Sequence, residues 1–187
     1  RMHHTMRFLY EYIKNQRSIG GAIPSSRFLA HLMLRHIDFE HATCISELGG
    51  GTGAITRHLI ARKKQETLLL VFEPHQHFAS ELEKMFHQNH VHIMKDSAEK
   101  LPQYLQKHDI GRADYIISSL PLTGWNCEQR KQLFSMLSGR VWKGGAYIQY
   151  QYFAPTYGRE LQRHFREVHL DATLLNVPPA WVYTCRK

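Results

Sequence analysis

A glycine-rich segment flanked by two acids is the part of the chain best suited to bind a polar ligand. Residues 47–53 read Glu-Leu-Gly-Gly-Gly-Thr-Gly and follow the short run at 44–46. Glycines at such a turn let the backbone take positive φ or approach a ligand without a Cβ in the way. The apolar run at 68–72 then ends in Glu73. An acid at the end of the second strand, about 20 residues past the glycines, is where nucleotide-binding folds hold ribose hydroxyls.

The order of these residues differs from the dinucleotide fingerprint, which has the spacing Gly-x-Gly-x-x-Gly. Here the spacing is Glu-x-Gly-x-Gly-x-Gly, with the first acid at the end of the preceding strand. This arrangement resembles motif I of the class I S-adenosylmethionine (SAM) methyltransferases. SAM carries an amino group and ribose hydroxyls that need acidic partners, so Glu47 and Glu73 are candidates for the two acids. The alternative is an ordinary α/β turn with two solvated acids.

The composition indicates a soluble globular protein with an anionic partner. The chain has 187 residues, a net charge of +8 and 3 widely spaced cysteines, with no apolar run long enough to span a membrane and no signal peptide at its start. Free thiols are typical of a reducing compartment, so we expect a cytoplasmic protein, peripheral on the inner face of the membrane if its partner is lipid. A basic surface suits nucleic acid or an anionic membrane. The spacing of His87, His90 and His92 is not that of a zinc site, and we expect no metal.

Strand-like and helix-like segments alternate along the chain, which is typical of a parallel sheet covered by helices. The short link at 177–180 cannot hold a parallel crossover, so the last two strands should be antiparallel. We therefore predict an α/β, Rossmann-like class I SAM methyltransferase fold with a seven-stranded, mostly parallel sheet and an antiparallel last strand. One domain should span 1–187, with 1–40 as an N-terminal helical lid or membrane-contact segment and no separate substrate domain after the last strand. The expected strands are 43–47, 68–73, 91–95, 113–119, 145–152, 166–175 and 181–186, and the expected helices are 6–16, 26–36, 54–63, 75–88, 97–107, 127–139 and 157–164.

Further polar residues follow the third, fourth and fifth expected strands. Asp96 is placed to accept from an adenine amine, or to cap a helix together with Ser97. The segment 118–122 reads Ser-Ser-Leu-Pro-Leu, where methyltransferases of the adenine type carry Asn/Asp-Pro-Pro-Tyr or Asn-Leu-Pro-Tyr. It lacks the aromatic that stacks an extruded base. Gln149 and Gln151 suggest an acceptor pocket, or are ordinary half-buried strand residues.

The N-terminal segment has an apolar stripe of Phe8, Leu9, Tyr12 and Ile13 among basic residues. Such an amphipathic helix suits a membrane interface, and it equally suits packing over the cofactor. The following segment, 20–26, should be a flexible turn whose Ser25 and Ser26 cap a helix or contact the ligand.

Five segments in order resemble the bacterial phospholipid N-methyltransferases, and the resemblance covers nearly the whole chain. They are 19–27, 47–53, 118–121, 147–152 and 176–180. The resemblance implies methylation of phosphatidylethanolamine headgroups at an anionic membrane surface, with a phospholipid as substrate and SAM as cofactor. It also implies an N-terminal helix that touches lipid. Gly50 stands where a proline is common, which should leave SAM binding intact. The chain also resembles the rRNA adenine dimethyltransferases around motif I.

These arguments give one set of expected site residues. Tyr10, Tyr12, Tyr152 and the carbonyl after Ser119 lie near the expected cleft, and 177–181 should line a headgroup pocket. A lipid N-methyltransferase, a nucleic-acid or small-molecule methyltransferase, and a SAM-binding protein without catalysis all remain open, with nucleic acid disfavoured by the missing aromatic. The expected catalytic residues are Ser119, Tyr152 and Tyr12, and the expected cofactor contacts are Glu47, Gly49, Gly51, Thr52, Gly53, Glu73, Pro74, Asp96, Ser97, Ser118, Ser25 and Ser26.

Overall fold

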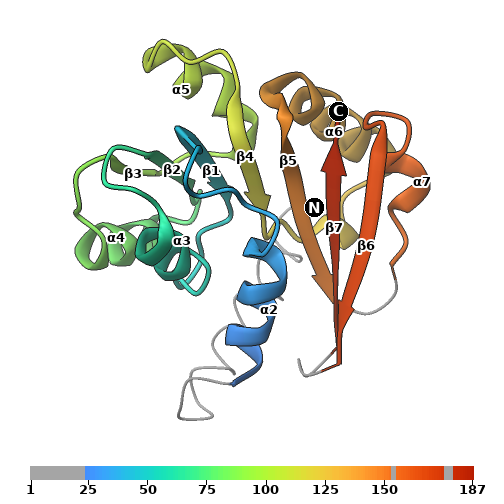
Figure 1. Cartoon of the computed structure of the whole chain (residues 1–187), viewed down its shortest axis with the longest axis horizontal. Helices are drawn as coiled ribbons and strands as arrows, with labels where there is room; N and C mark the ends of the chain where they lie inside the picture. Colours follow the sequence, from blue (N-terminus) through green and yellow to red (C-terminus); the bar gives the residue numbers. More distant parts are fainter. Residues whose placement is uncertain (1–23, 153–154, 175–178) are drawn as a thin grey trace.

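A seven-stranded sheet runs through the computed structural model, which describes residues 24–152, 155–174 and 179–187 (Figure 1). The strand order is β3-β2-β1-β4-β5-β7-β6, and β7 alone is antiparallel to its neighbours. The predicted fold class and the antiparallel last pair are therefore confirmed. The strands are β1 (Cys44–Leu48), β2 (Leu68–Phe72), β3 (Val91–Met94), β4 (Ala113–Ser118), β5 (Val141–Tyr152), β6 (Glu167–Thr173) and β7 (Ala180–Arg186).

Helices pack on both faces of the sheet and give the molecule two apolar cores. One core joins the sheet to α2 (Pro24–Leu34), α3 (Thr56–Arg62) and α4 (Gln76–Met85). The other joins it to α5 (Leu101–Lys107), α6 (Cys127–Arg140) and α7 (Gly158–Leu161). Every residue of β1 and β2 is buried, as expected for strands covered on both faces.

The predicted boundaries hold to within a few residues, with three larger differences. The helix expected over 97–107 is a short 3-10 turn, η1 (Ala98–Lys100), followed by α5. Pro102 has no N–H to donate to the preceding turn, so the α-helix begins next to it. The last predicted helix, 157–164, shrinks to α7, and β5 begins four residues earlier than expected. The helix predicted at 6–16 lies outside the described residues.

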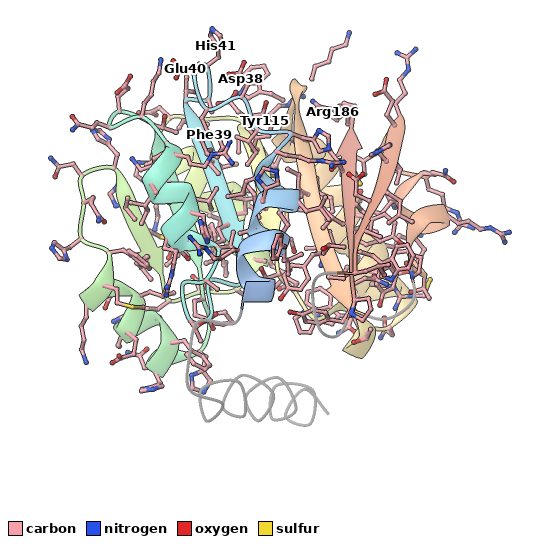
Figure 2. All side chains as sticks on the ribbon, turned by 60° about the horizontal axis from the view of Figure 1, so that its bottom comes forward. Asp38, Phe39, Glu40, His41, Tyr115 and Arg186 are labelled. Carbon is pink, nitrogen blue, oxygen red and sulfur yellow. The ribbon has the colours of Figure 1, made fainter. Side chains whose placement is uncertain are left out.

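The loop between α2 and β1 anchors α2 at the amino ends of the strands. Figure 2 shows this loop, residues 38–41, close to Tyr115. The N–H of Asp38 donates to the Tyr115 hydroxyl at 3.1 Å, and the guanidinium of Arg62 lies 4.4 Å from the centre of the Phe39 ring. This end of the sheet is opposite the glycine-rich turn.

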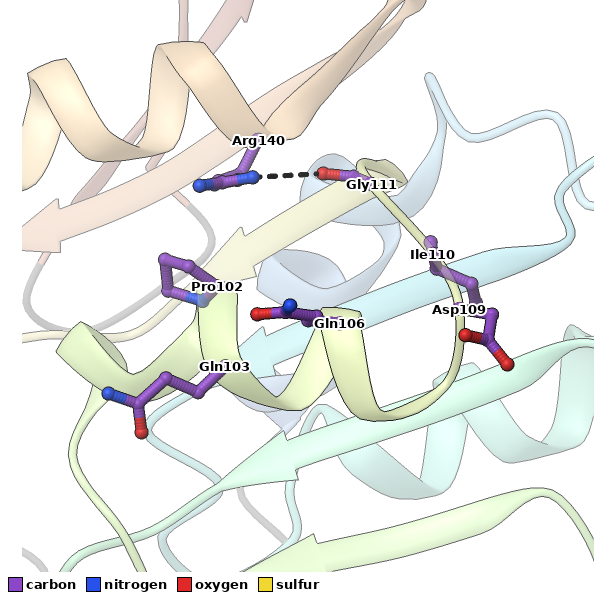
Figure 3. A pocket seen from close by; sticks show the side chains of 7 residues that line it. All are labelled: Pro102, Gln103, Gln106, Asp109, Ile110, Gly111 and Arg140. Carbon is purple, nitrogen blue, oxygen red and sulfur yellow. Dashed lines mark hydrogen bonds between the residues drawn. The ribbon is translucent and has the colours of Figure 1, made fainter.

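A shallow cavity of about 320 Å³ also lies at the amino ends of the strands (Figure 3). It precedes β4 and β5, between α5 and the last turn of α6, and is therefore remote from the glycine-rich turn. The cavity is lined by Pro102, Gln103, Gln106, Asp109, Ile110, Gly111 and Arg140.

Among the helices that the structure describes, none combines the length and the apolar character that a membrane span requires.

Candidate active site

The last residues of four adjacent parallel strands lie side by side in the sheet. Leu48 is in register with Phe72 on one side and Ser118 on the other, and Phe72 with Met94. The chain segments that leave these strands therefore share one edge, which spans about 14 Å at the usual strand spacing. The strand order reverses between β1 and β4, and ligands of open α/β sheets bind at such a switch point.

The glycine-rich turn folds back over the end of β2. The N–H groups of Gly49 and Gly50 both donate to the carbonyl of Phe72, at 2.8 and 3.1 Å. Gly49, Gly51 and Gly53 have positive φ, which other residues rarely adopt. A Cβ on Gly51 would meet nothing within 4 Å, so the outer face of the turn is open to a ligand.

Glu73 holds the glycine-rich turn in place. The residue is 6% exposed, and its carboxylate accepts the N–H of Gly51 at 2.8 Å and that of His75 at 2.9 Å. Burial raises the pKa of Glu73, and these two hydrogen bonds oppose the rise. Each carboxylate oxygen has a second acceptor site, so ribose hydroxyls can still bind there. Sequence reasoning predicted the ribose contact and missed the bond to the turn.

Glu47 is buried with one oxygen unpaired. It is 1% exposed, and its Oε2 has no hydrogen-bond partner among the described residues. Burial raises the pKa of Glu47 to about 8; the Thr56 hydroxyl opposes part of that rise and the Glu73 charge adds to it. Such a carboxyl ionises readily only when a cation sits beside it. The unpaired oxygen therefore fits the ammonium group of SAM.

Asp96 lies at the β3 end of the same edge. Its Oδ1 accepts the N–H of Ser97 at 2.9 Å, and the Tyr104 hydroxyl donates to its Oδ2 at 3.3 Å. Ser97 stands at the cap position of η1, yet its side chain makes no capping hydrogen bond there, unlike the predicted cap. Thr52 is half-buried in the glycine-rich turn, and Pro74 is exposed just after Glu73.

The turn also touches the segment after β4. Ser119 donates its N–H to the Leu48 carbonyl at 2.8 Å. A Cβ on Gly49 would lie 3.6 Å from the Cβ of Ser119, so the two segments are in contact. Ser118 is fully buried, and its hydroxyl accepts the N–H of Leu120 at 3.3 Å.

Gln149 uses its whole amide to shape this segment. Its Nε2 donates to the carbonyls of Leu120 at 3.2 Å and Tyr150 at 2.6 Å, and its Oε1 accepts the Tyr147 hydroxyl at 2.8 Å. It is fully buried. The sequence left open whether Gln149 lines an acceptor pocket or is an ordinary strand residue. In the structure its amide bonds to these three groups within the protein. Tyr152 lies on the opposite face of β5, packed against the core that contains α2, and its ring is 5.3 Å from that of Tyr150.

A clasp that sequence reasoning missed joins the segments after β4 and β5. Arg130 donates twice to the carboxylate of Glu160, both times at 2.8 Å, and its third nitrogen donates to the Trp125 carbonyl. The guanidinium also lies 5.2 Å from the centre of the Tyr157 ring. The side chain of Arg130 is 15% exposed and that of Glu160 is 24% exposed. No local pattern signals a pair separated by 30 positions.

Several predicted residues cannot be placed. Tyr10, Tyr12 and the first two residues of the expected headgroup segment 177–181 lie outside the described residues. The backbone of α2 begins at Pro24, so Ser25 and Ser26 lie in its first turn. The prediction that these serines precede the helix as caps is therefore wrong. Proline favours the first helical position because its missing N–H would be unpaired there anyway.

Comparison with known proteins places this geometry in a family. No family model matches the chain. The ornithine lipid N-methyltransferase of Singulisphaera acidiphila is 31% identical over 180 residues, which cover 96% of this chain and 94% of that protein. The resemblance predicted from the sequence, to lipid N-methyltransferases that use SAM, is confirmed.

Solved structures share the fold at low identity. The 1,6-didemethyltoxoflavin-N1-methyltransferase of Burkholderia thailandensis, crystallised with S-adenosylhomocysteine, has a TM-score of 0.70 and 10% identity over 98% of this chain and 87% of that one. The N-methyltransferase NodS of Bradyrhizobium japonicum has a TM-score of 0.66 and 14% identity over 88% and 98% of the two chains. A putative rRNA methylase of Clostridium thermocellum has a TM-score of 0.62 and 16% identity over 88% and 97%. The chain thus belongs to the family of the ornithine lipid N-methyltransferase and is a class I SAM-dependent N-methyltransferase.

Proposed function

We propose that this enzyme methylates the amine of an aminolipid headgroup at a membrane surface. The observation that carries the proposal is the identity to an ornithine lipid N-methyltransferase over almost the whole of both chains. Phosphatidylethanolamine, expected from the sequence resemblance, offers the same chemistry, a primary amine on a lipid. The three cysteines are free, which suits a reducing compartment, and the proposal therefore places the enzyme at the cytoplasmic face of the membrane.

The segment after β4 supports a lipid amine over an adenine base. Leu122 occupies the position where the adenine enzymes carry a stacking tyrosine, and it is 2% exposed. It packs in the core beneath α6 and offers no surface on which an extruded base could stack.

The buried acids and the glycine-rich turn would hold SAM, which supplies an electrophilic methyl group for direct displacement by a neutral amine. Glu47 would pair with the ammonium group, and Glu73 would accept the ribose hydroxyls. Asp96 would accept from the adenine amine, and the open face of the turn at Gly51 would leave room for the carboxylate of SAM to approach the backbone. Ser118, Thr52 and Pro74 would line the rest of the cofactor site.

The acceptor amine would lie next to Ser119. This residue touches Gly49, and its hydroxyl and carbonyl oxygens can accept hydrogen bonds from an amine. Catalysis would then come mainly from holding the amine in line with the methyl group. Tyr152 and Tyr12 are our further candidates for orienting the headgroup, and the N-terminal segment 6–16 is our candidate for a lipid contact.

The proposal is tested with labelled SAM and three acceptors in separate tubes. These are vesicles containing ornithine lipid, vesicles containing phosphatidylethanolamine, and undermethylated ribosomal RNA. We expect label in one or both lipids and mass spectra of the lipids that show added methyl groups. Label in the RNA alone would overturn the proposal. Label in neither lipid, from a protein that binds SAM, would point to a small-molecule amine or to binding without transfer.

A further inference from the structure

The charged side chains of α2 and α3 are all basic and form a surface that we call the α2–α3 basic surface. Neither 24–37 nor 54–65 contains an aspartate or glutamate. On α2 the basic residues recur every fourth position, which places them along one side of the helix. Figures 1 and 2 both show the two helices side by side, and they share one core. The surface comprises Arg27 and His31 of α2, Arg35 directly after it, and Arg57, His58 and Arg62 of α3.

The charges of the two helices act on one another. The pKa of His58 is lowered first by burial and then by the positive charges of Arg57, Arg27 and Arg62. Arg27 of α2 therefore lies close enough to α3 to repel a proton there. Among the described residues no carboxylate pairs with Arg27 or Arg62, whereas Arg35 is neutralised by Asp171. The unneutralised positive charge is thus greatest along the first turns of α2 and along α3.

The first turns of α2 and α3 adjoin the cofactor end of the sheet, whereas Arg62 in the last turn of α3 lies toward the opposite end, against Phe39. Helix α3 begins three residues after Gly53, and the guanidinium of Arg57 donates to the Gly53 carbonyl at 3.2 Å. Phe28 is 46% exposed beside Arg27. Basic residues together with an exposed aromatic are typical of helices that lie on a membrane interface.

We propose that the α2–α3 basic surface docks on an anionic lipid bilayer and so brings the first turns of α2 and α3, which adjoin the glycine-rich turn, next to the membrane. This inference rests on the proposed lipid substrate, which resides in a bilayer. Lipid is favoured over nucleic acid because the exposed aromatic suits an acyl boundary and because the buried Leu122 leaves no platform for a base. Each arginine near an anionic membrane strengthens binding by about fivefold.

The test compares two pairs of charge removals that leave the same net charge. Arg27→Gln with Arg62→Gln should weaken binding to vesicles of phosphatidylcholine and phosphatidylglycerol by about 25-fold, measured by co-sedimentation without SAM. Lys143→Gln with Arg166→Gln removes two exposed charges near the start of β5 and just before β6, at the end of the sheet opposite the glycine-rich turn, and should change binding less than about twofold. Arg27→Lys with Arg62→Lys keeps the charge and should keep the binding. Thermal unfolding and SAM affinity establish that each variant is folded.

Three results would overturn the proposal. The first is unchanged vesicle binding in the Arg27 and Arg62 pair, and the second is an equal loss in the two glutamine pairs, which would mean that only net charge matters. The third is a loss of RNA binding with vesicle binding intact, which would make this a nucleic-acid surface. Because the vesicles carry no aminolipid, docking is measured independently of methyl transfer. A protein that docks and yet methylates no lipid would sink the proposed function and leave the docking surface standing.

Discussion

The two halves of the sheet are built by different means. In the cofactor half, β1, β2 and β3, the site is made by backbone groups close in sequence to two buried acids. Gly49 and Gly50 bond to the end of the next strand, and Glu73 bonds back to Gly51. In the acceptor half, β4, β5, β7 and β6, side chains from distant positions hold the loops, as the Arg130–Glu160 clasp does. Cofactor binding should therefore be lost when a single charged residue of the cofactor half is replaced. Methyl transfer should be lost when a replacement in the acceptor half displaces its loops.

The largest expected effect comes from Glu47→Gln, which tests the cofactor half. Losing the carboxylate that pairs with an ammonium should weaken SAM binding by about 2–5 kcal/mol, because a buried cation is left unpaired. Calorimetry of SAM binding measures this. Ser46→Ala is the matched control, since the buried Ser46 hydroxyl has no hydrogen-bond partner in the part of the chain that the structure describes, and its loss should leave the affinity unchanged.

The same variant should change the pH dependence of stability in the free enzyme. The pKa of Glu47 is about 8 in the folded state against an ordinary value of 4.5, so between these pH values the folded protein keeps a proton that the unfolded chain has lost. The free energy of unfolding should fall as pH rises from about 4.5 to about 8, and Glu47→Gln should remove that slope. Denaturation at pH 5 and pH 8 compares the two proteins. An unchanged slope in the variant would mean that Glu47 is ionised without SAM.

Arg130→Ala tests the acceptor half. It leaves the carboxylate of Glu160 and the Trp125 carbonyl without their donor, which should cost about 1–3 kcal/mol of stability. We expect kcat/KM for the lipid to fall by about tenfold or more, because a small displacement of a positioning loop costs that much. SAM affinity should stay the same. Arg130→Lys keeps the charge without the two-point bond and should rescue only part of the loss. An equal loss of SAM affinity would show that the halves are not separable.

The same division explains what the sequence could predict. The strands at 44–48 and 68–72 are contiguous buried runs, and Glu47 and Glu73 stand at their ends, so a local pattern was enough to find them. The bond from Gly51 to Glu73 depends on how the turn folds back across 22 positions. The internal role of Gln149 depends on a carbonyl 29 positions away. Periodicity and spacing carry no information about such pairs, since they report only on neighbours within a few residues.

Gly50→Ala tests how tightly the cofactor half is packed. A Cβ at this position would lie 2.6 Å from Cγ1 of Val71 and 2.7 Å from Cδ1 of Leu82. Both side chains would have to move, at a cost of about 1–3 kcal/mol in unfolding free energy. Gly139→Ala is the control, because a Cβ there meets nothing within 4 Å and the residue lies in α6, where alanine should stabilise by about 0.5–1 kcal/mol. The free energies of unfolding of the two variants, measured with denaturant, should thus change in opposite directions. A Gly50→Ala protein as stable as the wild type would mean that α4 moves at little cost to make room for the methyl group.

The smallest expected effect is that of Tyr104→Phe, which removes one hydroxyl from the adenine end of the cofactor half. The hydroxyl donates to Asp96 over 3.3 Å, near the long limit of a hydrogen bond, and the ring packs edge-on against Phe72 at 5.4 Å. Phenylalanine keeps that packing and lets the Asp96 carboxylate turn more freely. If Asp96 accepts from the adenine amine, SAM affinity should fall by about 0.5–1 kcal/mol, with stability almost unchanged. Tyr104→Leu should cost more stability, because it also loses the ring contact. Calorimetry that shows no difference between wild type and Tyr104→Phe, with a clear loss for Asp96→Asn, would confine the adenine contact to Asp96 itself. No loss in either variant would remove this end of β3 from the cofactor site and restrict the comparison to β1, β2 and the glycine-rich turn.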